Sequence, residues 1–151
     1  MATNPFTMLV AVDLDDRGEI VLAEALCLAR RMNAVVDVVH VAPPEPSGFI
    51  GYEAGPDSVR DSVARRLRTE HRMVHGLREK VEAAGVTVGQ TLTIQAELTK
   101  GVIAEAKRLK PDILAIGHGR HSGLFRSRSL AEEVIEDLPC TVMVVPTSTS
   151  G

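Results

Sequence analysis

The sequence contains no tryptophan, and aromatic residues make up only 3% of its 151 residues. Proteins that bind single-stranded nucleic acid stack bases on aromatic side chains, and this chain offers no obvious platform for such stacking. It also lacks an excess of positive charge, because its formal net charge is -3 and its pI is about 5.9. A nucleic-acid-binding domain is usually basic, so we expect no nucleic acid among the partners.

Cysteine and long apolar segments are scarce as well. Cys27 and Cys140 lie far apart and form no C-x-x-C pair, which argues against a zinc site or a thioredoxin-type motif. We interpret both as reduced, buried packing residues. No apolar run approaches the length of a membrane span, and the N-terminal "MATNPFTMLVAV" lacks the pattern of a secretory signal. We therefore predict a cytoplasmic protein without membrane contact.

The chain does contain short apolar runs that alternate with helix-like stretches. Runs that are almost continuously apolar are typical of parallel strands covered on both faces, whereas the run that carries Gly89 alternates and is expected to be more exposed. The expected strands are Thr7–Asp13, Ala34–Val41, Val86–Gln95, Asp112–Gly117 and Thr141–Pro146. Apolar residues at steps of three and four predict the helices. These are Glu19–Met32, Val59–Ala84, Lys100–Lys110 and a segment from about Ser129 to just before Pro139.

Local signals mark the ends and faces of these helices. Asp15 or Asp16 is a good N-cap or first-turn acid for the first helix, and Asn33 tolerates the left-handed conformation in which a helix ends. Gly85 ends the second helix, which is amphipathic except at Glu70. The face of the first helix that we expect to pack on the sheet contains Ile20, Ala23, Leu26 and Cys27.

The order of strands and helices predicts one doubly wound α/β domain with right-handed crossovers. Its core spans residues 6–146, and residues 147–151 form a tail. The segment Ala42–Pro56 is long, irregular and rich in proline and glycine. A loop of this length in a compact domain is often a lid or a binding loop, although a mobile connector remains the alternative.

Ligands of open α/β sheets bind at the carboxyl ends of the strands, and several candidates lie there. Asp13 and Val41 close the first two strands, and the turn Gly117–Gly123 follows the fourth. Glycine lets the backbone approach a ligand, successive amides form anion-binding nests, and arginine suits phosphate. The turn and its continuation carry Gly117, Gly119, Gly123, Arg120, Arg126 and Arg128. We expect either an anion site or a simple connector.

Other polar groups have plainer explanations. Ser129-x-x-Glu132 is a capping box, which does not exclude a ligand, because a capped helix still presents free amides. His118 and His121 have no third partner for a metal in view, and we assign His40 no role. The arginines of the long helix fit a solvated face better than a nucleic-acid site. Neither a P-loop nor a G-x-S-x-G elbow is present.

Nearly the whole chain, from Phe6 to Pro146, resembles the universal stress protein family. The matching segments are "MLVAVD", "ALCLARRMNAVVDVVHV", "KPDILAIGHGR" and "SLAEEVIEDLPCTVMVVP". The resemblance implies five parallel strands in the order 3-2-1-4-5 and homodimers paired through the C-terminal strand. It also implies, for some members, ATP or another adenine nucleotide, with or without magnesium. The nucleotide-binding residues would be Asp13, Val41 through its backbone, Gly117, Gly119, Arg120, Gly123, Arg128, Ser129 and Leu130.

The glycine pattern of this chain departs from that of the nucleotide-binding members. One residue separates Gly117 from Gly119, where the family pattern has two, and Arg128 stands where a glycine precedes the serine. "ELT", Glu97 to Thr99, replaces a Gly-x-Pro that commonly precedes the third helix. The Arg128 side chain either blocks a phosphate or binds it through a charge-assisted pair.

These observations support a regulatory protein that binds an adenine nucleotide without turning it over. The missing glycine keeps a second interpretation open, in which a nucleotide-independent protein acts through its dimer or loop surface and a protein partner. An enzyme, such as a slow ATPase or a nucleotidyl transferase, rests on analogy of fold alone. We therefore predict no catalytic residues and no metal site.

Overall fold

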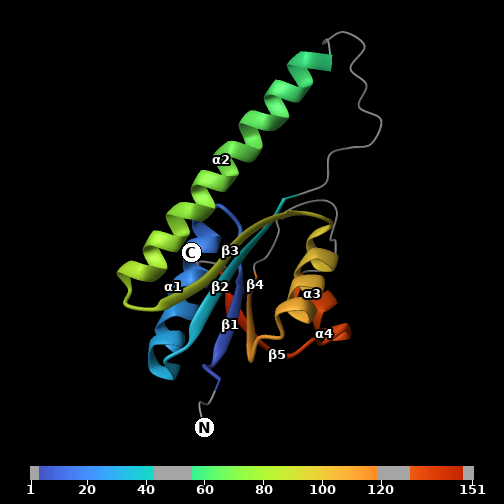
Figure 1. Cartoon of the computed structure of the whole chain (residues 1–151). Helices are drawn as coiled ribbons and strands as arrows, with labels where there is room; N and C mark the ends of the chain where they lie inside the picture. Colours follow the sequence, from blue (N-terminus) through green and yellow to red (C-terminus); the bar gives the residue numbers. More distant parts are fainter. Residues whose placement is uncertain (1–3, 43–55, 119–129, 148–151) are drawn as a thin grey trace.

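The computed structural model describes residues 4–42, 56–118 and 130–147 (Figure 1). A five-stranded parallel sheet with the order β3-β2-β1-β4-β5 forms its centre, which confirms the expected doubly wound α/β fold. The strands are β1 (Thr7–Ala11), β2 (Val35–Ala42), β3 (Thr87–Gln95), β4 (Ile113–His118) and β5 (Thr141–Pro146). The helices are α1 (Asp16–Met32), α2 (Pro56–Ala83), α3 (Leu98–Leu109) and α4 (Leu130–Glu136).

The helices form two layers, with α1 and α2 on one face of the sheet and α3 and α4 on the other (Figure 1). Neighbouring residues of β1 serve both layers, because Val10 packs in the core beneath α1 and α2, whereas Leu9 packs in the core beneath α3 and α4. Both side chains are fully buried. This double burial explains why the strands are nearly continuous apolar runs.

Local hydrogen bonds and backbone conformations define the helix ends, as the sequence predicts. The Asp15 carboxylate caps α1 by accepting from the backbone N–H groups of Arg17 and Gly18, at 3.0 and 3.1 Å. Because this cap is in place, α1 begins at Asp16, before the expected Glu19. Asn33 ends α1 with φ 52°, and Gly85 follows α2 with φ 75°.

Several strand ends differ from the prediction. β1 stops at Ala11, so that Val12 and Asp13 belong to the connection to α1. Asp112 lies just before β4, and its carboxylate accepts from the Thr7 N–H at 2.8 Å and ties the start of β4 to β1. β3 lies at the edge of the sheet and is only partly buried, which confirms the more exposed strand expected from its alternating pattern.

The predicted packing face of α1 is wrong in part. Leu26 is buried, but Ala23 and Cys27 are exposed, and the buried face consists of Gly18, Val21, Leu22, Ala25, Leu26 and Ala29. Cys27 is therefore not a packing residue, and Cys140 is only half-buried. Burial nevertheless raises the pKa of the Cys140 thiol. Both thiols are free.

α2 is one long helix, as predicted, but it spans 28 residues and begins at Pro56, before the expected Val59. Its arginines Arg60, Arg65, Arg66, Arg68 and Arg72 are exposed, which confirms the solvated face. Arg78 is half-buried and pairs with Glu82 at 3.3 Å. Within the described residues, no helix is both long and apolar enough to span a bilayer.

Candidate functional site

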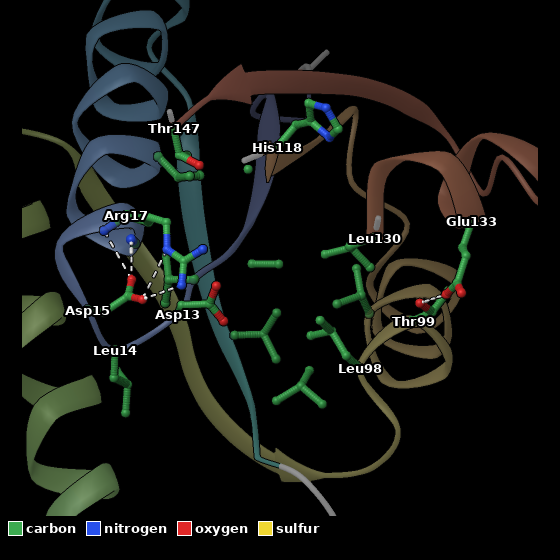
Figure 2. Close-up of a pocket in the computed structure, with 18 of the residues that line it drawn as sticks. Asp13, Leu14, Asp15, Arg17, Leu98, Thr99, His118, Leu130, Glu133 and Thr147 are labelled. Carbon is green, nitrogen blue, oxygen red and sulfur yellow. Dashed lines mark hydrogen bonds and ion pairs between the residues drawn. The ribbon is translucent and has the colours of Figure 1, made fainter. Parts of the chain in front are cut away.

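A cavity of about 730 Å³ opens at the carboxyl ends of β1, β2 and β4 (Figure 2). The strand order reverses between β1 and β4, and open α/β sheets bind their ligands at such a switch point. The volume lies within the range of about 300–1,000 Å³ that is typical of small-molecule sites. Size and position together make this cavity the candidate site.

Four of the sequence-predicted site residues line this one cavity, namely Asp13, Val41, Gly117 and Leu130. Val41 is 8% exposed, whereas Asp13 is exposed at the cavity mouth. The other predicted residues lie outside the described part of the chain; they are Gly119, Arg120, Gly123, Arg128 and Ser129. The structure therefore brings four of the nine predicted residues together at one cavity, and the other five lie outside the described residues.

The connection from β1 to α1 forms one wall of the cavity. Gly18 makes this connection possible, because a Cβ atom there would lie 1.7 Å from the carbonyl oxygen of Asp13. Asp15 caps α1 and also pairs with the Arg17 guanidinium at 3.3 Å (Figure 2). A capping aspartate, a close-packed glycine and a paired arginine thus hold the segment that carries Asp13.

The opposite wall comes from the first turn of α3 and from α4. Glu97, Leu98 and Thr99 line the cavity from α3, so the "ELT" segment lies at the site itself. Glu97 occupies the N-cap position, but its side chain makes no capping hydrogen bond. The Thr99 hydroxyl donates to the carboxylate of Glu133 on α4 (Figure 2). This bond joins the two helices at the cavity wall.

Carboxylates dominate the charge of the described lining. Four acidic residues belong to this lining, namely Asp13, Asp15, Glu97 and Glu133. Arg17 is the only arginine or lysine in the described lining. An anionic ligand placed here needs further positive charge to offset these groups. The sequence carries such charge in Arg120, Arg126 and Arg128, which fall outside the described residues.

Sequence reasoning missed Thr147, which we assigned to the tail. This residue is buried, lines the cavity, and donates its backbone N–H to the His118 carbonyl at 2.9 Å. A Cβ atom at Gly117 would lie 3.0 Å from the Thr147 methyl group and 2.7 Å from the Val21 side chain. The sequence offers no local signal for Thr147, because its burial depends on this contact across the sheet.

His118 lies at the cavity, but its surroundings do not resemble a metal site. Its side chain is exposed at the end of β4, and His121 lies outside the described residues. Over residues 4–42, 56–118 and 130–147, no group of three or more histidine, cysteine, aspartate or glutamate side chains is arranged to hold a metal ion.

Comparison with known proteins gives a consistent result. A sequence model of the universal stress protein family matches residues 6–146. Universal stress protein A homolog 1 from Coxiella burnetii is 28% identical over 139 residues, which cover 91% of this chain and 94% of that protein. The structure of universal stress protein UspA from Lactobacillus plantarum superimposes with a TM-score of 0.71 at 18% identity, covering 95% of this chain and 99% of that one.

Two further structures of similar fold contain nucleotides. A universal stress protein in complex with cAMP has a TM-score of 0.67 at 16% identity and covers 97% of this chain and 100% of that one. A universal stress protein family protein from Arabidopsis thaliana with AMP bound has a TM-score of 0.66 at 18% identity, with coverage of 96% and 94%. At these identities the superpositions establish the shared fold.

Proposed function

This chain belongs to the universal stress protein family, and from that premise we propose that it is a cytoplasmic regulatory protein that binds an adenine nucleotide in the cavity at the ends of β1, β2 and β4. The observation that carries the proposal is the convergence of Asp13, Val41, Gly117 and Leu130 on one cavity. The cAMP and AMP bound to the two structural neighbours support adenine as the base.

Each residue has a role in this proposal. The Val41 backbone recognises the adenine, and the Asp13 carboxylate accepts hydrogen bonds from the ribose or the base. Gly117 lets the ligand approach the end of β4, and Leu130 lies at the start of α4, where the helix dipole favours a phosphate. In the turn that precedes α4, Gly119, Arg120, Gly123, Arg128 and Ser129 are proposed to bind the phosphates.

The charge of the cavity adds a condition to nucleotide binding. Asp13, Asp15, Glu97 and Glu133 oppose a polyphosphate, so we propose that ATP enters with Mg²⁺ and that Arg128 supplies charge in place of the family's glycine. A monophosphate or a cyclic nucleotide meets less repulsion and does not need the metal.

Thermal unfolding in the presence of nucleotides tests the proposal. A ligand at about 100 times its Kd stabilises the folded state by about 2.7 kcal/mol, which raises the Tm of a domain of this size by about 5–10 °C. We expect this rise with at least one of Mg-ATP, ADP, AMP and cAMP, and its loss in Asp13→Ala. The matched control is Asp16→Ala, because Asp16 is an exposed acid of the same segment that does not line the cavity.

No change in Tm with any of the four nucleotides would contradict nucleotide binding and favour the interaction protein. Asp13-dependent release of ADP during long incubation with ATP would contradict binding without turnover.

The edge of the sheet supports a second part of the proposal, the homodimer. Among the described residues, β5 pairs only with β4, so its outer edge presents backbone groups that no described strand pairs. Large apolar side chains lie exposed on β5 and on the chain just before it: Val144 is 40%, Ile135 56% and Leu138 60% exposed. We propose that a second copy of the chain covers this edge.

A further inference from the structure

His40 is a buried polar residue that the proposed nucleotide contacts do not use. It lies on β2, directly before Val41, and is 9% exposed. Its Nδ1 atom lies 3.1 Å from the carbonyl oxygen of Val12. A carbonyl oxygen only accepts hydrogen bonds, so the Nδ1 atom carries the proton and donates.

This hydrogen bond fixes the chain directly before Asp13. The register of β1 with β2 ends at the pair Ala11 and Val39. Beyond it, the Val12 N–H donates to the Val39 carbonyl at 3.0 Å, and the Val12 carbonyl accepts from the His40 ring. Both backbone groups of Val12 are therefore bound to β2 after the strand itself has ended.

The second ring nitrogen of His40 faces Glu70 on α2. The Nε2 atom lies 4.0 Å from the Glu70 Oε2 atom, and the Glu70 side chain is 17% exposed. This Oε2 atom is buried and has no hydrogen-bond partner among the described residues. A buried carboxylate oxygen without a donor is unfavourable. A second proton on the ring would place an N–H group opposite that oxygen and supply the missing donor.

The other described residues around His40 carry little competing charge. Arg66 lies 3.7 Å from the other oxygen of Glu70. On β3, Thr93 is the register partner of His40 and is uncharged. Arg68, His71 and Arg72 border a hollow beside Thr93, and on the β1 side the next charged residue along the chain is Asp13. Among the described residues, the Glu70 carboxylate is thus the charged group that directly faces the ring.

We propose that His40 is a positioning residue for the ligand site and that its protonation beside Glu70 strengthens ligand binding. The inference rests on the proposed nucleotide site at Asp13. The protonated ring pairs with Glu70, and its Nδ1–H becomes a stronger donor to the Val12 carbonyl, because charge-assisted hydrogen bonds are about twice as strong as neutral ones. Ligand affinity is consequently higher when the ring is protonated than when it is neutral.

Two amide substitutions separate the two ring nitrogens. His40→Asn places an amide N–H near the Nδ1 position and retains the donor to Val12, but it does not reach Glu70. His40→Gln reaches toward Glu70 but has no donor at the Nδ1 position. Cyclic AMP is the ligand chosen for the test. Its phosphodiester keeps one negative charge between pH 8 and 5.5, so the charge of the ligand does not change over the measurement.

Calorimetric titration with cyclic AMP between pH 8 and 5.5 measures the effect. We expect wild-type affinity to rise about threefold to tenfold toward pH 5.5. His40→Asn should match the wild type at pH 8 and lose this rise, and His40→Gln should bind about threefold to tenfold more weakly throughout. Glu70→Gln should also lose the rise. Glu79→Gln and His71→Asn, which alter exposed side chains of the same helix, should behave as the wild type.

Equal affinity of His40→Gln and the wild type would overturn the positioning role. An unchanged pH profile in both His40→Asn and Glu70→Gln would overturn the role of the proton.

A measurement without ligand separates this inference from the proposed function: the NMR chemical shift of the Val12 carbonyl carbon should change in His40→Gln and stay the same in His40→Asn. If that shift behaves as expected but no nucleotide binds, the proposed function fails while the positioning of Val12 stands. If His40→Gln leaves it unmoved, the positioning of Val12 is overturned.

Discussion

Gly18 is the residue on which the geometry of the candidate site depends most directly. Its backbone touches the Asp13 carbonyl so closely that any side chain forces the two segments apart. Glycine within a helix costs up to about 1 kcal/mol relative to alanine, so a glycine in the first turn of α1 is explained here by contact and not by helix propensity.

We therefore expect Gly18→Ala to lower the free energy of unfolding by about 1–3 kcal/mol, as overpacking of a close contact does, and to weaken nucleotide binding at Asp13. Gly76→Ala is the matched control, since a Cβ atom at this position of α2 meets nothing within 4 Å and should stabilise the protein by about 0.5–1 kcal/mol. Urea denaturation measures both changes. Equal stability of Gly18→Ala and the wild type would contradict the close approach to Asp13.

For single residues, the sequence predicts those features that depend on neighbours along the chain. The cap at Asp15 and the left-handed Asn33 follow from local hydrogen bonding and backbone preference. Thr147 does not, because its burial depends on contacts with residues distant in sequence. The prediction that Cys27 is buried failed for a related reason. Because α1 is apolar around much of its circumference, periodicity alone does not identify its packing face. Contact with the sheet determines which side of the helix is buried.

The two halves of α2 differ in packing. Val74, Leu77 and Val81 in its C-terminal half are at most 7% exposed, whereas residues 60–70 include no buried side chain. The same N-terminal half extends beyond the sheet in Figure 1. Glu70 and its contact with His40 mark the boundary between the two halves.

This division predicts unequal costs for one substitution placed in each half. Leu77→Ala removes a buried side chain, so it should lower the free energy of unfolding by about 2–5 kcal/mol. Leu67→Ala, at a half-buried position, should cost about 1 kcal/mol, because less apolar surface returns to water. Urea denaturation of both variants measures the difference. Equal costs would mean that the N-terminal half of α2 is packed as tightly as the C-terminal half.

Elements were predictable to within a few residues because their apolar periods are strong. Two of the ends that moved lie where a side chain contacts a distant segment, Asp112 with Thr7 and His40 with Val12. Periodicity along one strand carries no information about such partners. For the same reason His40 and Glu70 gave no functional signal until the fold placed them face to face.

For the whole molecule, the alternation of strands and helices predicts the fold class, but it does not determine which strands are neighbours. The order 3-2-1-4-5 came from resemblance to a family, and the structure confirms it. That order places the carboxyl ends of β1, β2 and β4 around one cavity. Asp13, Val41 and Gly117 could be placed at this cavity from the sequence because they lie at or next to strand ends, whereas the positions of Glu133 and Arg17 required the folded helices.

The outer edge of β5 leads to the prediction for the assembled protein. Burying the exposed side chains of Val144, Ile135 and Leu138 would remove apolar surface from water, and pairing of the strand edge would satisfy its free backbone groups. We expect the wild type to be a dimer in light scattering coupled to size-exclusion chromatography.

Val144→Lys should shift the protein from dimer to monomer, because a charge on a covered edge is costly to bury. Met32→Lys is the control, since Met32 is a 43% exposed apolar residue at the end of α1 and does not belong to β5. A wild-type monomer, or a dimer that survives Val144→Lys, would show that this edge does not mediate assembly. If a dimer forms elsewhere, its interface must lie on another face.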